Sequence, residues 1–227
     1  MSAQSALQSL DRRNEVASKP VLTSILGLVL TFGVGSLPFP AWDNELKDVA
    51  HMLGNEAIYW MLVAATLAYV VFVEKRALSS IGFRMPAVRD LFLGLVFAVV
   101  VIAGLAALYL IVLPALHLGE EQAVRALAAA PAWWLVISVV RAGVSEEVLF
   151  RGYPIERLQS LTGSRSVAAL LPLALFALAH VGSWGWVHLI VAGFGGAMLT
   201  GLYFWKRNLW VNIMVHVLVD GMALLSA

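Results

Sequence analysis

The sequence contains no cysteine, few charged residues and no cluster of basic ones. Without cysteine there is no disulfide framework, no thiol nucleophile and no thiolate metal site, so the chemistry must use Glu, His, Asp, Ser or Arg side chains. The net charge of +1 and the dispersed basic residues argue against nucleic acid as a partner. Because only 13% of the residues are charged, each charge inside an apolar segment needs an explanation.

Long apolar runs make up most of the chain, which is 61% hydrophobic and has a mean hydropathy of +0.86. Runs of about 17 to 25 residues match the length needed to cross ~30 Å of hydrocarbon. We therefore predict an all-α, polytopic transmembrane helix bundle with about seven spans and an active site in an intramembrane cavity. The spans are expected at residues 21–37, 56–73, 91–113, 132–152, 167–182, 187–205 and 209–226.

The polar segments divide the chain into three predicted parts. Residues 1–20 are polar and form a disordered cytosolic leader, because no small-residue cleavage site follows the first apolar run. Residues 21–78 form two accessory transmembrane helices. Residues 79–227 form the catalytic transmembrane core, which begins in a loop containing Ser79, Ser80, Gly82 and Pro86.

Basic residues are unevenly distributed between alternate loops. Since basic residues in short loops stay on the cytoplasmic side, the pattern places the amino terminus in the cytosol and the carboxyl terminus outside. We predict an integral, multi-pass protein of the cytoplasmic membrane of a prokaryote. Only Lys47 and Arg125 fall on the outer side. The predicted cytosolic segments contain Arg12, Arg13, Lys19, Lys75, Arg76, Arg84, Arg89, Arg157, Arg165, Lys206 and Arg207.

Small residues and aromatic residues predict how the spans pack and where they end. Gly193, Ala197 and Gly201 recur every four residues in the sixth span, with Ala192, Gly196 and Thr200 beside them, which favours close helix packing. We expect Trp133, Trp134, Trp184 and Trp186 at the outer interface. His188 is also expected there, and we assign no role to it or to the outer-loop residues His51 and His117.

The most informative stretch runs from Arg141 to Tyr153 and reads RAGVSEEVLFRGY. Glu147 and Arg151 are four residues apart, so an ion pair is predicted that lowers the cost of burying both. Glu146 lies about 100° around the helix and is the freer carboxylate. In a poorly solvated cavity it would suit the role of a general base. The alternative is that both glutamates only neutralise Arg141 and Arg151.

Polar residues also occur in two further spans, where hydrocarbon should reject them. His180 lies in the fifth span, and the seventh holds Asn212, His216 and Asp220. The spacing of His216 and Asp220 permits a direct contact or two ligands to one ion. Together with the double glutamate, these groups suffice to activate water and to stabilise an oxyanion. For Arg141 itself we expect a structural partner or a water contact, and less favourably a substrate carboxylate or lipid headgroup.

Three motifs occur in order on these spans, and together they resemble the CPBP intramembrane proteases. This is the family of type II CAAX prenyl endopeptidases and bacteriocin-processing enzymes, also called the Abi family. The resemblance covers about residues 79 to 225 and is supported by Phe150-Arg151-Gly152-Tyr153 and Asn208-Leu209-Trp210. The motifs are Glu146-Glu147-x-x-x-Arg151, Phe176-x-x-x-His180 and His216-x-x-x-Asp220.

The resemblance implies hydrolysis of a peptide bond within the membrane, in a membrane-associated protein or peptide. It implies that Glu146 activates water with the help of His180, and that His216 and Asp220 stabilise the oxyanion. Glu147 and Arg151 would support the site. Many members of the family have Asn where this chain has Asp220. Since an ionised Asp cannot donate a hydrogen bond, Asp220 must be protonated, orient His216 or bind a cation.

Two mechanisms remain open at this point, a glutamate protease and a metal-dependent endopeptidase. If zinc is the cofactor, its candidate ligands are Glu146, Glu147, His180 and His216, but no H-E-x-x-H motif fixes a metal geometry. No other cofactor is predicted.

Other functions and several substrates also remain open. A proton- or ion-coupled transporter would explain intramembrane Glu, His and Arg, but it predicts internal repeats, and none is found. A catalytically silent scaffold or bacteriocin-immunity protein is a further alternative. The substrate could be a prenylated C-terminal tail, a bacteriocin leader or a C-terminal sorting signal, because no motif identifies the residues that bind it.

Overall fold

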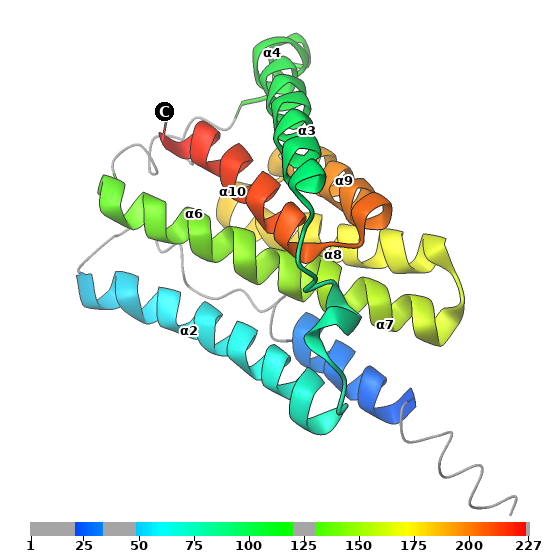
Figure 1. Cartoon of the computed structure of the whole chain (residues 1–227). Helices are drawn as coiled ribbons and strands as arrows, with labels where there is room; N and C mark the ends of the chain where they lie inside the picture. The colour runs from blue at the N-terminus through cyan, green and yellow to red at the C-terminus, as the bar shows by residue number, and fades with distance from the viewer. Residues whose placement is uncertain (1–20, 34–48, 120–129, 226–227) are drawn as a thin grey trace, which may run out of the picture.

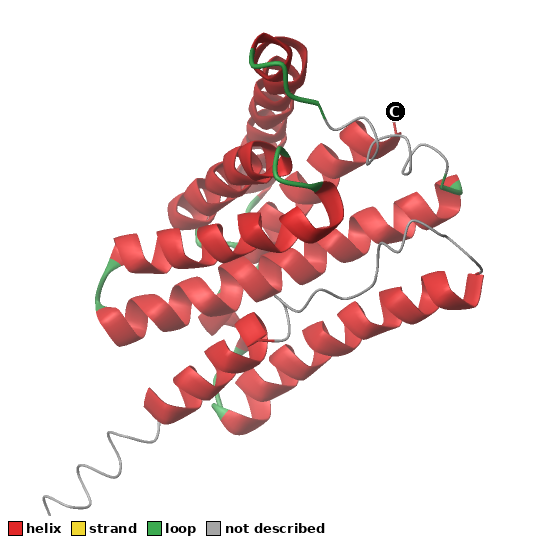
Figure 2. Cartoon of the chain, turned by 180° about the vertical axis from the view of Figure 1, so that it is seen from behind, coloured by secondary structure: helices red, strands yellow, loops and turns green. Residues whose placement is uncertain are grey.

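The computed structural model describes residues 21–33, 49–119 and 130–225, and every element within these ranges is helical (Figures 1 and 2). The predicted leader at residues 1–20, the outer-side residues Lys47 and Arg125 and most of the alanine-rich loop lie outside the described residues.

The helices follow one another with short connections. A first apolar helix covers Val21–Gly33. The elements after it are α2 (Val49–Ala68), η2 (Tyr69–Val73), η3 (Leu78–Ile81), α3 (Val88–Ala107), η4 (Leu108–Val112), α4 (Leu113–Ala115), α6 (Ala132–Glu146), η5 (Glu147–Gly152), α7 (Tyr153–Thr162), α8 (Arg165–Trp184), α9 (His188–Lys206) and α10 (Leu209–Leu225). Of the short elements, η2, η4 and η5 are π-helical and η3 is a 3-10 helix.

Among the described residues, four helices are long and apolar enough to cross a membrane: Met52–Val73, Val88–Ala115, Arg165–Trp184 and His188–Lys206. Val21–Gly33 and Leu209–Ala223 are apolar but shorter. The predicted helical membrane bundle is therefore confirmed. The count of seven spans and the orientation of the termini stay predictions.

The continuous helix formed by α6, η5 and α7 runs through the middle of the bundle (Figure 1). Along α6 it packs against α2 and α10, and along α7 it packs against α8. α9 lies against α8, and α3 contacts α10 and α9 while standing steeply to the other helices (Figure 1). The predicted fourth span was expected to end near residue 152, but the helix continues to Thr162.

This extension changes the environment of Arg157, which was predicted to lie in a cytosolic loop. Arg157 is in α7 and only 1% exposed, and its Nη2 lies 2.6 Å from Oε2 of Glu74, just after η2. The burial is tolerated because the guanidinium is paired and also donates to Ser80. The ion pair ties the end of the second helix to α7.

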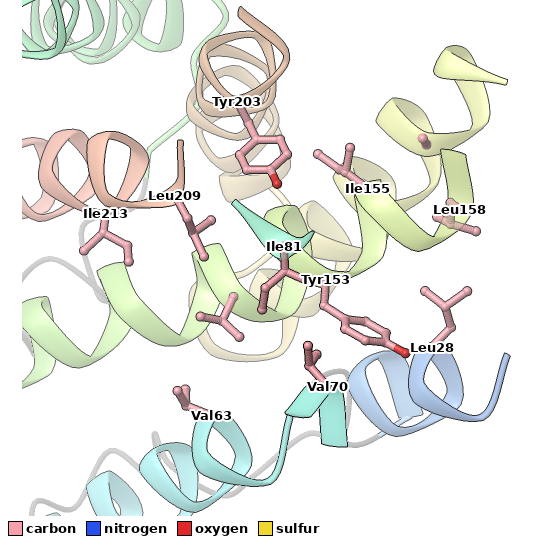
Figure 3. Close-up of a cluster of buried hydrophobic side chains, with 12 residues drawn as sticks. Leu28, Val63, Val70, Ile81, Tyr153, Ile155, Leu158, Tyr203, Leu209 and Ile213 are labelled. Carbon is pink, nitrogen blue, oxygen red and sulfur yellow. The ribbon is translucent and has the colours of Figure 1, made fainter. Parts of the chain in front are cut away.

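The main apolar cluster lies where η2, η3, η5, α7 and α10 meet (Figure 3). Ile81, fully buried, sits between Tyr153 and Leu209 in this cluster (Figure 3). Gly152 allows the close approach of η3, because a Cβ there would lie 2.8 Å from the carbonyl oxygen of Ile81. The cluster holds the C-terminal part of the central helix against η3 and α10. This is the end of the helix that was predicted to face the cytosol.

The segment after η3 also fixes the start of α10. Gly82, at a φ of 93° that favours glycine, accepts a hydrogen bond from the amide of Leu209 at 2.8 Å. Asn208 donates to the carbonyl of Arg84, and its Oδ1 accepts from the amides of Trp210 and Val211 as a helix cap. Because α10 bears His216 two turns further on, these contacts set the position of that histidine.

Close packing of α9 uses one of the two rows of small residues that the sequence predicted for it. Ala192, Gly196 and Thr200 are buried, and a Cβ on Gly196 would lie 2.8 Å from Leu173 of α8. By contrast, Gly193 and Gly201 face open space. Of the two rows of small residues predicted to allow close packing, the row of Ala192, Gly196 and Thr200 faces α8, whereas Gly193 and Gly201 do not contact a neighbouring helix.

Candidate active site

Three segments of the bundle bring the predicted site residues together. Glu146 ends α6 and Glu147 begins η5, while His180 lies near the C-terminal end of α8 and His216 in the middle of α10. π-Helical turns such as η5 recur at functional sites in proteins because they alter the phase of the side chains along a helix. The polar groups form two layers, which we call the inner layer and the outer layer.

The inner layer is built around Glu147, which is 0% exposed. Its Oε1 lies 2.8 Å from Nη1 of Arg151 and 2.8 Å from Nδ1 of His216. Its Oε2 accepts a hydrogen bond of 3.0 Å from Asn212. The predicted ion pair between Glu147 and Arg151 is confirmed, and both carboxylate oxygens are fully committed to protein groups.

The outer layer is built around Glu146, whose side chain is 19% exposed. Its Oε2 lies 3.6 Å from Nε2 of His216 and 3.9 Å from Nε2 of His180. Oδ2 of Asp220 lies 3.3 Å from the same Nε2 of His216. These separations exceed ordinary hydrogen-bond lengths for Glu146, so its carboxylate remains available to a further group.

His216 joins the two layers through its two ring nitrogens. Nδ1 contacts Glu147, and Nε2 faces Glu146 and Asp220. The carboxylate that orients the ring through Nδ1 is therefore Glu147, whereas Asp220 lies beside the nitrogen that faces the outer layer. This geometry assigns Nδ1–H as a donor to Glu147.

His180 is oriented by its own helix and by stacked rings. Its Nδ1 lies 2.7 Å from the carbonyl oxygen of Phe176, which assigns Nδ1–H as the donor and leaves the lone pair on Nε2 facing Glu146. The Phe176 ring is 4.5 Å away, and the ring of His188 stacks at 5.6 Å on it. His188 in turn stacks on Trp184 at 4.7 Å.

Two residues of this site had no role in the sequence analysis. Asn212 was noticed as an intramembrane polar residue, and its position one turn before His216 was the available signal. His188 was expected at the outer interface without a role, but it is 9% exposed and packs on His180. No sequence pattern indicated that contact, because it joins the end of α8 to the start of α9.

Arg141 has a structural partner, as expected, on the second helix. Its Nε lies 3.2 Å from Oε2 of Glu56, whose Oε1 accepts a hydrogen bond of 2.8 Å from Ser138. The guanidinium Cζ lies 4.3 Å from the centre of the Tyr59 ring. The sequence left open that Glu146 and Glu147 only neutralise Arg141 and Arg151. Because Glu56 is the partner of Arg141, neither glutamate is needed to neutralise that arginine.

The four candidate zinc ligands do not fit a metal as they stand. Both oxygens of Glu147 are occupied by Arg151, His216 and Asn212. Within the described ranges, no three His, Asp or Glu side chains are grouped in a way that could hold a metal ion. We therefore derive no step through a metal.

These features define a helical membrane protein with a partly buried carboxylate and histidine centre, a set of groups suited to hydrolysis. Residues 128–222 match the family model described as Rce1-like, type II CAAX prenyl endopeptidase. The predicted resemblance to the CPBP family is therefore confirmed over residues 128–222, which contain all three motifs. No curated protein and no solved structure matches the chain.

Proposed function

We propose that the protein is an intramembrane endopeptidase that hydrolyses a peptide bond of a membrane-associated protein or peptide. The observation that carries the proposal is the convergence of Nε2 of His180 and Nε2 of His216 on one oxygen of Glu146. That oxygen has no partner at hydrogen-bond distance among the described residues, whereas both oxygens of the adjacent Glu147 are bonded to protein groups. The family match supports protease chemistry over a transporter, and the convergence of Glu146, His180 and His216 favours an active enzyme over a silent scaffold.

In the first step, a water molecule donates one proton towards Glu146 and the other towards the lone pair on Nε2 of His180. Its oxygen attacks the carbonyl carbon of the scissile bond, and Glu146 takes up the proton. The carbonyl oxygen becomes an oxyanion that accepts a hydrogen bond from Nε2–H of His216. That donation requires a proton on Nε2 of His216 as well as on Nδ1, and the ring lies beside the carboxylates of Glu146, Glu147 and Asp220.

In the second step, the C–N bond breaks and the proton held by Glu146 passes to the leaving nitrogen. The products are a new carboxyl group and a new amine, and Glu146 is again ionised. The separations of 3.6 and 3.9 Å fit this scheme, because catalytic contacts are commonly long before the substrate closes the site. Glu147 and Arg151 position the centre through His216.

The proposal is tested by incubating the purified protein in liposomes with prenylated peptides ending in a CAAX-type sequence, bacteriocin leader peptides and C-terminal sorting signals. We expect the wild type to cleave at least one class, and Glu146→Ala and His180→Ala to leave it intact. Equal cleavage by all three proteins would contradict the proposed roles. Elemental analysis of the active protein is the matching test for a metal-dependent mechanism.

A further inference from the structure

The group formed by Glu56, Tyr59 and Arg141 lies outside the three family motifs and joins the second helix to the helix that bears Glu146. Arg141 is 7% exposed and Glu56 is 5% exposed. Burying an ion pair stabilises a fold little, since the desolvation cost offsets much of the attraction. A pair placed here therefore calls for a role beyond holding two helices together.

The guanidinium of Arg141 uses only one of its three nitrogens. Nε contacts Glu56, and among the described residues no acceptor lies within hydrogen-bond distance of Nη1 or Nη2. Unlike Nη2 of Arg151, which is sealed inside the protein, these two nitrogens are not fully buried. They are donors in an apolar helix bundle that face accessible space.

Tyr59 connects this group to the candidate active site. Its ring lies against the Arg141 guanidinium, and the residue interacts electrostatically with Glu146 as well as with Arg141 and Glu56. Along the helix, Arg141 and Glu146 are five residues apart, about 7.5 Å of rise and about 140° of rotation, so the link between them runs through the second helix. On that helix, Leu62 packs against the cluster that contains Phe150 and Phe176 beside the site.

A substrate cleaved inside the membrane must present an extended backbone, because a helical peptide bond is shielded from attack. Its carbonyl groups then need donors, since an unpaired polar group in apolar surroundings is costly. Glu56 cancels the charge of Arg141 without occupying Nη1 and Nη2. Such a group favours an uncharged peptide carbonyl over a carboxylate or a lipid phosphate.

We propose that Arg141, held by Glu56 and Tyr59, forms a substrate subsite that donates hydrogen bonds to a backbone carbonyl near the scissile bond. The inference rests on the proposed endopeptidase function. It also gives the second helix, which lies outside the region that matches the family, a part in substrate binding.

The test measures binding of a fluorescent prenylated peptide ending in a CAAX-type sequence to the full-length Glu146→Gln protein in detergent. Adding Glu56→Gln and Arg141→Met replaces the ion pair with a neutral, apolar-compatible pair and keeps an acceptor for Ser138. We expect a folded protein whose affinity falls about tenfold or more, as for the loss of a charge-assisted hydrogen bond. In the active protein the same double change should raise KM and leave kcat nearly unchanged.

Glu74→Gln with Arg157→Met is the matched control, because it also replaces both partners of a buried ion pair of the central helix but lies outside the subsite. It should leave the affinity unchanged. An unchanged affinity in the folded Glu56→Gln/Arg141→Met protein would overturn the subsite and leave the proposed function standing. A tenfold loss seen only with a free C-terminal carboxylate, and not with the amidated peptide, would overturn recognition of a backbone carbonyl. Failure of the Glu146→Gln protein to bind the prenylated peptide, a bacteriocin leader peptide and a C-terminal sorting signal alike would overturn both proposals.

Discussion

Glu146 and Glu147 are neighbours in sequence but lie in opposite environments. Glu147, in the inner layer, is sealed and has a protein partner for each oxygen. Glu146, in the outer layer, is partly exposed, and its nearest nitrogens are at 3.6 and 3.9 Å. A carboxylate whose two oxygens both have protein partners can hold a site together, whereas a carboxylate without close partners can act on a water molecule.

The largest effect on activity is expected for Glu146→Gln. The substitution keeps the shape of the side chain but removes the group that accepts a proton, so kcat should fall about 10²- to 10⁴-fold. The midpoint of thermal unfolding should stay the same, because Glu146 has no close partner to lose. Cleavage assays and a melting curve on one preparation measure both quantities, and a large drop in melting temperature would contradict the assignment to the outer layer.

The opposite pattern is expected for Glu147→Ala. Removing this carboxylate leaves Arg151 as an unpaired buried charge, which typically costs about 3 to 5 kcal/mol of stability. Chemical or thermal unfolding in detergent measures the loss. Replacing both partners, as Glu147→Leu with Arg151→Met, should recover part of the stability without recovering activity, and full activity in that variant would show that the inner layer is dispensable.

Asn212→Leu should produce a smaller effect on the same layer. The amide donates to Glu147 and to the carbonyl oxygen of Leu199, at 3.0 and 2.8 Å. Losing buried donors costs about 1 to 3 kcal/mol. Ser138→Ala is a control of similar burial outside the two layers, and equal effects on kcat from both variants would contradict a specific role for Asn212.

Asp220→Asn should have the smallest effect, with substantial activity retained, because an amide at this position can still lie beside Nε2 of His216 and can donate to an oxyanion. The activity should fall less than about tenfold on the scale of acid and base contributions. Near-complete loss of activity together with loss of a bound metal, detected by elemental analysis, would replace the glutamate mechanism with a metal-dependent one.

Local spacing predicted much of the site. The four-residue separation of Glu147 and Arg151 and that of His216 and Asp220 place each pair on one helical face, and both contacts are present. The helical membrane bundle followed from the apolar runs in the same way. These features depend on helix geometry, which is the same wherever a helix lies in a fold.

The features that escaped prediction depend on how helices pack. Glu56 and Arg141 are 85 residues apart, and no periodicity relates them. His188 meets His180 only because α9 turns back along α8, and the sequence did not indicate which of the two predicted rows of small residues on α9 would be buried. Such contacts follow from the tertiary arrangement, so the sequence named the polar residues but not all of their partners.

The most direct test of the central claim is single-turnover cleavage in ¹⁸O-labelled water by the wild type and Glu146→Gln, followed by mass spectrometry. The account predicts a wild-type product with ¹⁸O in its new carboxyl group, and a rate at least about 10²-fold lower for Glu146→Gln with an unchanged melting temperature. Labelled product formed by Glu146→Gln at the wild-type rate would contradict the claim that this carboxylate activates the water.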